Sequence, residues 1–305
     1  MMTEAASVAY VFPGQASQDV GMGLEFYNKY EVARRVFDLV DTVLGFSISD
    51  LCFNGPEEEL VKTVNVQPAI VACSIACYEV ARNHKINFPP PSFLAGHSLG
   101  EYTALIVAES LDYEDALRLV RERGRLMYEA GLRYPGGMLA IIATEISTVE
   151  ELCTMSGCNI SNINCPGQIV VSGSDEALEK AKTLAKEQHI RRVIPLKVSG
   201  AFHSYLMQPI LDEFRQLIGN TSFRKPVYPV ISNVTARPLI DADSIKDELV
   251  KQLRYCIQWQ SSIEYLNSCG VTEYYEIGLG TVLSGLIKRI DQNAVLHNIS
   301  TSEDL

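Results

Sequence analysis

The sequence predicts an α/β fold in which a small domain is inserted into a larger one. Short apolar segments such as Val8 to Phe12 and Phe93 to Ala95 precede longer segments with apolar residues at helical spacing. This alternation is typical of a parallel sheet covered by helices. A Gly-x-Ser-x-Gly pattern, Gly96 to Gly100, lies between one such strand and the helix after it. Between residues 136 and 199 the order of elements changes, which indicates the insertion.

The turn around Ser98 is the most informative stretch. Prolines at 89–91 bar a helix before Phe93, so a short buried strand is expected there, and residues 101–111 follow with helical spacing. At such a strained turn the serine stands exposed at the helix N-terminus, where the N–H of Leu99 can stabilise an oxyanion. We therefore predict an α/β-hydrolase-like large domain with Ser98 as the nucleophile. A glycine-rich turn with a surface serine is the alternative.

The first expected strand, Val8 to Phe12, stops at Pro13-Gly14-Gln15. Open parallel sheets bind their ligands at the C-terminal ends of the strands. The N–H of Gln15 can thus join that of Leu99 in an oxyanion hole. An ordinary turn explains this loop equally well.

A serine nucleophile needs a base, and the chain has five histidines. His203 follows an expected strand, in a loop of small residues at the junction of the two domains, and is favoured for that reason. His97 directly precedes the serine, so its side chain is expected to point away from it. The rival assignment follows the α/β-hydrolase order, with Asp241 or Asp243 and then His297.

The inserted segment is expected to form the ferredoxin-like split βαβ unit, with the order βαββαβ. Its strands are expected at 138–143, 159–164, 169–172 and 193–198, and its helices at 149–155 and 175–189. We predict that residues 136–199 form this ferredoxin-like inserted domain, and that 1–135 and 200–305 form the α/β-hydrolase-like catalytic domain. Other helices are expected at 30–44, 68–84 with Pro68 in the first turn, 113–134, 206–218, 243–253, 261–269 and 282–290, and other strands at 230–232 and 272–277.

Composition and charge exclude several classes of protein. The 305 residues carry a formal net charge of -11 without clustered cations, which disfavours nucleic acid as a partner. The sequence has no run of about eighteen apolar residues, so no membrane span is expected. The N-terminus lacks the features of a secretory signal. The eight cysteines are scattered without a Cys-x-x-Cys pair, which argues against a metal site and for a reducing cytoplasm. Arg191-Arg192 and Lys288-Arg289 are candidate basic patches for an acidic partner.

A series of motifs runs from about residue 8 to residue 290. In order, they are Phe12-Pro13-Gly14-Gln15-Ala16-Ser17-Gln18, Gln67-Pro68-Ala69, Gly96-His97-Ser98-Leu99-Gly100-Glu101, Arg123-Gly124-Arg125-Leu126-Met127, Pro166-Gly167-Gln168, Ala201-Phe202-His203-Ser204 and Tyr275-Glu276-Ile277-Gly278. The series resembles that of the malonyl-CoA:acyl carrier protein transacylases. This family includes the bacterial fatty-acid enzyme and the acyltransferase domains of polyketide synthases.

The resemblance implies a transferase with a covalent intermediate. It would move a malonyl group from malonyl-CoA to Ser98 and then to the phosphopantetheine thiol of an acyl carrier protein, in fatty-acid or polyketide synthesis. His203 resembles the family's base, and Gln15 and Leu99 match the two oxyanion-hole amides. The group that orients the histidine is a main-chain carbonyl in this family, and here it is expected to be that of Gln258.

The resemblance also assigns the acyl pocket. Arg123 matches the arginine that pairs with the malonyl carboxylate, a role suited to a planar guanidinium. Gln67 lines the same pocket, and His97 is counted among the residues around the substrate. Phe202 and Leu99 resemble the pattern that selects malonyl over methylmalonyl groups.

No metal or tightly bound cofactor is implied by the resemblance, and the expected partners are malonyl-CoA and an acyl carrier protein, with neither nucleic acid nor membrane. The sequence departs from the family at Ala16, Leu279 and Thr281. A hydrolase acting on carrier-bound acyl groups and a non-catalytic docking subunit are the competing functions. Arg123 argues against a hydrolase of uncharged acyl groups.

Overall fold

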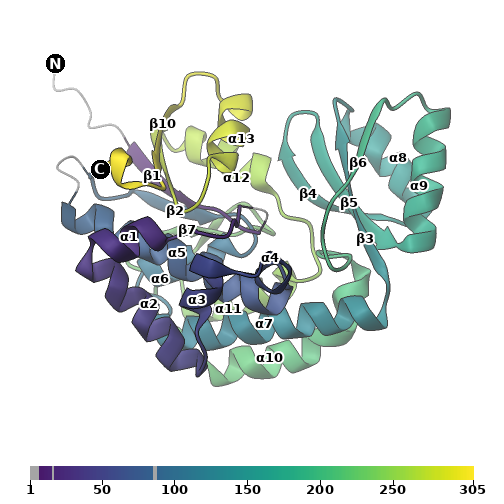
Figure 1. Cartoon of the computed structure of the whole chain (residues 1–305). Coiled ribbons are helices and arrows are strands. Elements are labelled where there is room, and N and C mark those ends of the chain that lie inside the picture. Colours follow the sequence, from purple (N-terminus) through teal and green to yellow (C-terminus); the bar gives the residue numbers. More distant parts are fainter. Residues whose placement is uncertain (1–6, 16, 85–87) are drawn as a thin grey trace, which may run out of the picture.

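The structure is a computed structural model that describes residues 7–15, 17–84 and 88–305. It contains two sheets, a larger one enclosed by helices and a smaller one built from residues 136–195 (Figure 1). We call the smaller sheet and its two helices the small lobe, and the remainder the large lobe.

The large sheet is parallel except at one edge. Its strands are β1 (Ser7–Phe12), β2 (Phe93–Gly96), β7 (Val230–Ile231), β8 (Pro238–Leu239), β9 (Val271–Ile277) and β10 (Val295–Ile299). They are ordered β10-β9-β1-β2-β7-β8, and only β8 runs antiparallel to its neighbour. Because Phe12 pairs with Gly96, the loops that follow β1 and β2 start side by side at the C-terminal edge of the sheet.

Helices cover both faces of the large sheet. They are α1 (Leu24–Lys29), α2 (Glu31–Leu44), α3 (Ile48–Asn54), α4 (Glu57–Leu60), α5 (Thr63–His84), α6 (Gly100–Val107), α7 (Tyr113–Arg133), α10 (Leu211–Asn220), α11 (Ala242–Gln252), α12 (Trp259–Ser268) and α13 (Val282–Ile290), with 3-10 turns at Tyr205–Ile210 and Ser302–Asp304. Side chains alternate along a strand. Thus Val8, Tyr10 and Phe12 belong to the core that contains α2, α5, α6 and α7, whereas Ala9 and Val11 pack with α12 and α13.

Helix α5 begins five residues before Pro68, so this proline lies inside the helix and the prediction of its position in the first turn is wrong. A proline cannot donate a hydrogen bond to the carbonyl four residues earlier. That carbonyl, of Val64, instead accepts a bond of 2.9 Å from Nη1 of Arg121. Helix α5 is also long and apolar enough to cross a membrane, but 78% of its apolar window is buried inside the protein, as expected of a core helix.

The small lobe consists of β3 (Gly136–Ile142), α8 (Ile146–Ser156), β4 (Asn159–Cys165), β5 (Gln168–Ser174), α9 (Asp175–Glu187) and β6 (Arg192–Pro195). The predicted order of these elements is confirmed. The sheet is antiparallel, in the order β4-β5-β3-β6. Leu139 and Ile141 face α8 and α9, whereas Met138 and Ala140 join the core of the large lobe.

Several boundaries differ from those expected. The strands β8 and β10 were not predicted, and β6 ends at Pro195 rather than continuing to 198. The segment expected as one helix at 206–218 is a 3-10 turn followed by α10. Pro209 lies inside that turn and interrupts regular α-helical bonding.

Candidate active site

Ser98 occupies the turn between β2 and α6 with a φ of +51°, in the left-handed region that residues other than glycine rarely adopt. The glycines on either side allow the chain to cross itself closely. A Cβ on Gly96 would lie 2.0 Å from the carbonyl carbon of Gly100, and one on Gly100 would lie 2.0 Å from the carbonyl oxygen of Phe12. The predicted sequence of strand, sharp turn and helix is therefore confirmed.

Asn233, in the turn that follows the neighbouring strand β7, stabilises the serine turn. The N–H of Ser98 donates to its Oδ1 at 2.6 Å, and its Nδ2 donates to the carbonyl of Gly96 at 2.7 Å. Glu101, fully buried after the turn, accepts a bond of 3.1 Å from the N–H of Asn233. No role was predicted for Asn233 or Glu101 from the sequence. Asn233 could have been singled out from the sequence, because it is a polar residue directly after an expected strand, at the edge of the sheet where ligands bind.

His203 faces the serine. Its Nε2 lies 2.8 Å from Oγ of Ser98, and its Nδ1 lies 2.6 Å from the main-chain oxygen of Gln252. A carbonyl can only accept, so Nδ1 carries the proton and Nε2 accepts from the serine hydroxyl. Burial, reinforced by the charge of Arg123, lowers the pKa of His203 to about 3. The imidazole is therefore neutral at pH 7, as a base that removes the serine proton must be.

The carbonyl that orients His203 belongs to Gln252, so the prediction of Gln258 is wrong. Gln252 is the last residue of α11, and carbonyls in the last turn of a helix have no partner within it. Gln258 instead precedes α12, and its carbonyl accepts from the N–H and the hydroxyl of Ser262, both at 2.9 Å. The oxygen of Gln258 is thus engaged by its own helix, whereas that of Gln252 is available to the imidazole.

The rival pair of acid and histidine is engaged elsewhere. Asp241 caps the N-terminus of α11, the helix that contains Asp243. His297 stacks on the ring of Tyr275 with centroids 4.4 Å apart, and its Nε2 lies 3.7 Å from a carboxylate oxygen of Glu273. The structure therefore favours His203 over His297 as the partner of the serine.

Arg123 reaches the same serine from α7. Its Nη2 lies 3.3 Å from Oγ of Ser98 and 3.0 Å from Oε1 of Gln252, and its Cζ lies 5.5 Å from the ring centroid of Tyr102. The side chain is completely buried, which lowers the pKa of the guanidinium. Its Nε and Nη1 have no hydrogen-bond partner within the described part of the chain. Buried polar groups are nearly always paired, so these donors mark a place for an anionic group.

The main-chain N–H groups of Gln15 and Leu99 donate to no acceptor among residues 7–15, 17–84 and 88–305. Their loops touch, because a Cβ on Gly14 would lie 2.5 Å from the carbonyl oxygen of His97. Two free donors on adjoining loops, one of them next to the serine, suit an oxyanion hole. Ala16, one of the departures from the family pattern, lies outside the described residues.

Gln67 and Phe202 border this region. Gln67 is completely buried on α5, and its Nε2 donates to Oε1 of Gln15 at 3.2 Å and lies 3.4 Å from Sδ of Met127. Its own Oε1 has no partner within the described ranges. Phe202 is buried directly before His203. The structure therefore brings Gln67 to the Gln15 loop and Phe202 to the base.

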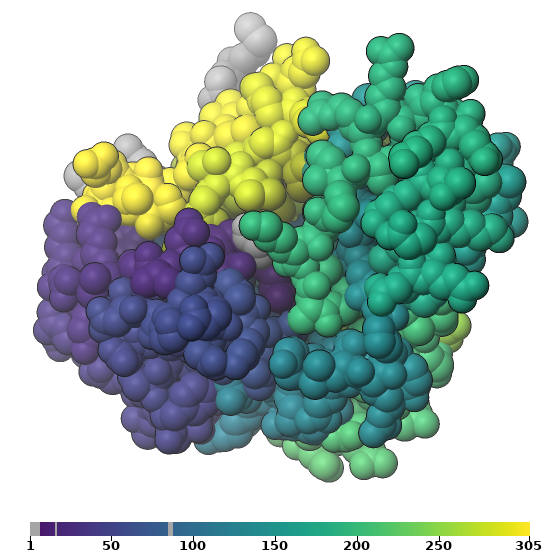
Figure 2. Space-filling view, turned by 45° about the vertical axis from the view of Figure 1, so that its right-hand side comes forward, coloured from purple at the N-terminus to yellow at the C-terminus, as the bar shows by residue number. Residues whose placement is uncertain are grey.

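His97 joins the two lobes. Its Nε2 lies 2.9 Å from Oδ1 of Asn164 in β4, and its ring meets that of Trp259 edge-on at 5.5 Å. Burial lowers the pKa of His97. Figure 2 shows a hollow in the surface between the green segment around residue 200 and the purple and blue N-terminal segments. The side chain of His97 is thus engaged between the lobes, away from Oγ of Ser98.

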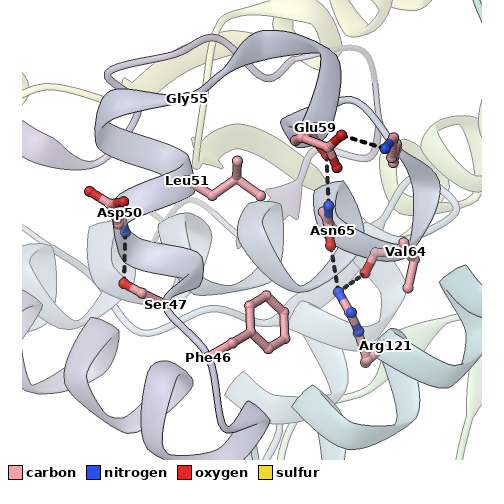
Figure 3. Close-up of a pocket in the computed structure, with 10 residues that line it drawn as sticks. Phe46, Ser47, Asp50, Leu51, Gly55, Glu59, Val64, Asn65 and Arg121 are labelled. Carbon is pink, nitrogen blue, oxygen red and sulfur yellow. Dashed lines mark hydrogen bonds and ion pairs between the residues drawn. The ribbon is translucent and has the colours of Figure 1, made fainter.

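A cavity of about 560 Å³ lies elsewhere, between α3, α4, the start of α5 and α7. At its edge Arg121 donates to the carbonyl of Val64 at 2.9 Å and to Oδ1 of Asn65 at 2.6 Å, with its guanidinium 4.5 Å from the ring centroid of Phe46 (Figure 3). None of the residues around Ser98 lines this cavity. In the described residues, no group of three or more His, Cys, Asp or Glu side chains could hold a metal ion.

Known proteins resemble this chain over nearly its whole length. The family described as acyl transferase domain matches residues 9–290. The malonyl CoA-acyl carrier protein transacylase of Bacillus subtilis is 41% identical over 98% of this chain and 95% of its own length. The structure of an acyl carrier protein S-malonyltransferase from Vibrio cholerae has a TM-score of 0.93 and 37% identity, covering 98% of both chains.

A further structure shows a malonyl-transacylase in complex with its type II PKS acyl-carrier protein. It has a TM-score of 0.94 and 36% identity, covering 98% of this chain and 97% of that one. The identities exceed a third and the matches span nearly the whole length of both partners. The chain therefore belongs to the malonyl-CoA:acyl carrier protein transacylase family.

Proposed function

We propose that this protein transfers the malonyl group of malonyl-CoA to the phosphopantetheine thiol of an acyl carrier protein, through a malonyl ester of Ser98. One observation carries the proposal. The hydroxyl of Ser98 lies 2.8 Å from a neutral imidazole and 3.3 Å from a buried guanidinium with unpaired N–H groups. The first contact supplies a nucleophile, and the second supplies a place for the free carboxylate of the acyl group.

In the first half-reaction, Nε2 of His203 takes the proton of Ser98 as Oγ attacks the thioester carbonyl. The negative charge that develops on the carbonyl oxygen is stabilised by the N–H groups of Gln15 and Leu99. The carbon–sulfur bond then breaks, His203 gives its proton to the sulfur, and coenzyme A leaves as the thiol. The carbonyl of Gln252 holds the imidazole in the required tautomer throughout.

The second half-reaction runs in the opposite sense. The phosphopantetheine thiol of the carrier protein gives its proton to His203 and attacks the malonyl ester, and Oγ of Ser98 recovers the proton as the carbon–oxygen bond breaks. Water must be excluded while the ester waits, since hydrolysis would waste the malonyl group. The burial of His203, Arg123 and Phe202 supports such exclusion.

Arg123 is proposed to bind the malonyl carboxylate, with Gln67 and His97 lining the pocket. Phe202 is proposed to crowd the branch of a methylmalonyl group, although one methyl group changes the binding free energy by only about 1 to 3 kcal/mol. The preference for malonyl over acetyl groups is expected to be stronger, because a donor without the carboxylate leaves the buried guanidinium of Arg123 unpaired.

We also propose a division into a catalytic domain, 1–135 and 200–305, and an inserted domain, 136–199. The parallel sheet with the serine turn supports the α/β-hydrolase-like description of the first. The antiparallel order β4-β5-β3-β6 with two helices on one face supports the ferredoxin-like description of the second. The scattered free cysteines agree with a cytoplasmic location.

The test is intact-mass measurement after mixing the protein separately with malonyl-CoA, methylmalonyl-CoA and acetyl-CoA. We expect a malonyl adduct that disappears in Ser98→Ala and moves to an added holo-carrier protein. Release of coenzyme A without a lasting adduct would indicate a hydrolase instead, and no reaction with any donor would refute the transferase.

A further inference from the structure

We infer that the side chain of Gln252 positions Arg123 and thereby sets the selectivity for a carboxylated acyl donor, separately from the action of its main-chain carbonyl on His203. The inference rests on the proposed function. Gln252 then has two tasks, which belong to different atoms. Its main-chain oxygen orients His203, and its side-chain amide positions Arg123.

The main-chain and side-chain atoms of Gln252 contact different parts of the site. Its main-chain oxygen accepts from Nδ1 of His203 at 2.6 Å. Its Oε1 accepts from Nη2 of Arg123 at 3.0 Å, and its Nε2 donates to the carbonyl of Ser98 at 2.9 Å and to the carboxylate of Glu101. The side chain is completely buried.

These contacts fix which way the amide points. The carbonyl of Ser98 can only accept, and the carboxylate of Glu101 lies on the same side, so the NH2 group of Gln252 must face them. Oε1 is then the end that faces Arg123. Glu101 is held in turn by the N–H of Asn233, the residue that stabilises the serine turn. The acceptor offered to the guanidinium is therefore rigidly placed.

Arg123 depends on that acceptor. A long arginine side chain loses considerable conformational entropy when it is held in one position, and Nη2 of Arg123 donates to Oε1 of Gln252 and to Oγ of Ser98. Oγ becomes part of an ester when the serine is acylated, and an ester oxygen is a poor acceptor. Oε1 of Gln252 is then the acceptor that persists, while Nε and Nη1 stay free for the malonyl carboxylate.

The experiment compares two donors in a variant that keeps the main-chain carbonyl. In Gln252→Met a side chain of similar length loses both polar atoms. Because a hydrogen bond to a charged group is lost, the ratio of kcat/KM for malonyl-CoA to that for acetyl-CoA should fall about 10- to 100-fold. Equal losses for both donors would overturn the inference, because they would place the effect on His203 or on the fold.

A second variant keeps the test decisive if Gln252→Met does not fold. Gln252→Asn keeps the polar amide but is one methylene shorter, so its carbonyl oxygen should no longer reach Nη2 of Arg123. The donor ratio should again fall, and an unchanged ratio would overturn the inference. Gln216→Met, on the exposed face of α10, is the matched control. Malonyl transfer by the wild-type protein is measured first, and its absence would refute the proposed function itself.

Discussion

Helix α7 carries arginines on two faces, and the hydrogen-bond partners of these arginines differ between the faces. On the outer face Arg125 bonds to Glu122, Glu129 and Glu213 at 2.8, 3.0 and 2.6 Å. On the inner face Arg123 bonds to no carboxylate, and its acceptors are an amide and a hydroxyl. The arginine with the most ion pairs is therefore the one without a place for a ligand, and the buried arginine with unpaired donors is the one that can select an anion.

Helical geometry explains the division. Residues 121 and 125 are four apart and share a face, whereas 123 points nearly the opposite way. The inner face also requires small residues, since a Cβ on Gly124 would lie 2.5 Å from the carbonyl oxygen of Thr63. Close packing of α7 on α5 buries Arg123 completely, and no carboxylate of the described residues forms an ion pair with it. We therefore expect an incoming carboxylate to find few competitors for the guanidinium.

The largest effect is expected from Arg123→Ala. Truncating one partner of a buried charge pair costs about 2–5 kcal/mol, so kcat/KM for malonyl-CoA should fall by roughly two to three orders of magnitude. Acetyl-CoA, which has no carboxylate, should lose much less. Acylation of Ser98 with each donor, followed by rapid quench and intact mass, measures both. Equal losses for the two donors would show that Arg123 serves the fold rather than the donor.

The second effect concerns His203, whose pKa is lowered to about 3 by burial and by the charge of Arg123. Unfolded histidine has a pKa near 6.5, so between about pH 6.5 and pH 3 the unfolded chain binds a proton that the folded protein does not. The contribution of His203 to stability is thus complete above about pH 6.5. It should fall by about 1.4 kcal/mol for each pH unit below it.

The raised pKa values of the buried carboxyls of Glu101 and Glu248 act in the opposite direction. The measurement is therefore the difference in unfolding free energy between the wild-type protein and His203→Gln, from urea titrations at pH 4 to 7. The wild-type protein should lose stability faster on acidification. Parallel curves would show that His203 has an ordinary pKa in the folded protein.

The sequence was sufficient for the serine turn and for the position of His203 in the fold, because both depend on local patterns. Glycines at 96 and 100 are required by close crossings of the chain. His203 lies in the segment that leads from the small lobe back to the large lobe. Arg123 was distinguished from its neighbours by family resemblance alone. Its distinguishing feature, burial without a carboxylate, is a tertiary property that no single helix pattern contains.

Two of the errors, at Gln258 and at Pro68, have a common physical cause. Gln252 and Gln258 are equivalent glutamines until the end of α11 and the start of α12 are known, because only a helix end leaves a carbonyl free. Likewise Pro68 suggested a helix start, and the actual start depends on a distant donor, Arg121, that satisfies Val64. In both cases the missing information was a partner from another element for one main-chain carbonyl.

Arg121 itself gives the third prediction. Arg121→Met should destabilise the protein by about 1–3 kcal/mol, because the carbonyl of Val64 loses its donor, without changing the donor ratio. In a Pro68→Ala background residue 68 regains an N–H for that carbonyl, so the same substitution should cost less. Thermal or urea unfolding of the four proteins measures this coupling. Additive effects would contradict the link between the arginine and the proline.

The smallest effect is expected from Arg125→Gln, despite its three carboxylate partners. The side chain is 35% exposed, and those of Glu129 and Glu213 are more than half exposed, so water and salt screen the charges and the loss should be below about 1 kcal/mol. Neither donor's kcat/KM should change, since no atom of Arg125 contacts Ser98, His203 or Arg123. Unfolding at low and at 0.5 M salt, with acylation rates alongside, is the measurement. A loss of malonyl selectivity as large as that of Arg123→Ala would remove the distinction between the two faces of α7, because the outer charges would then act on the donor across the helix.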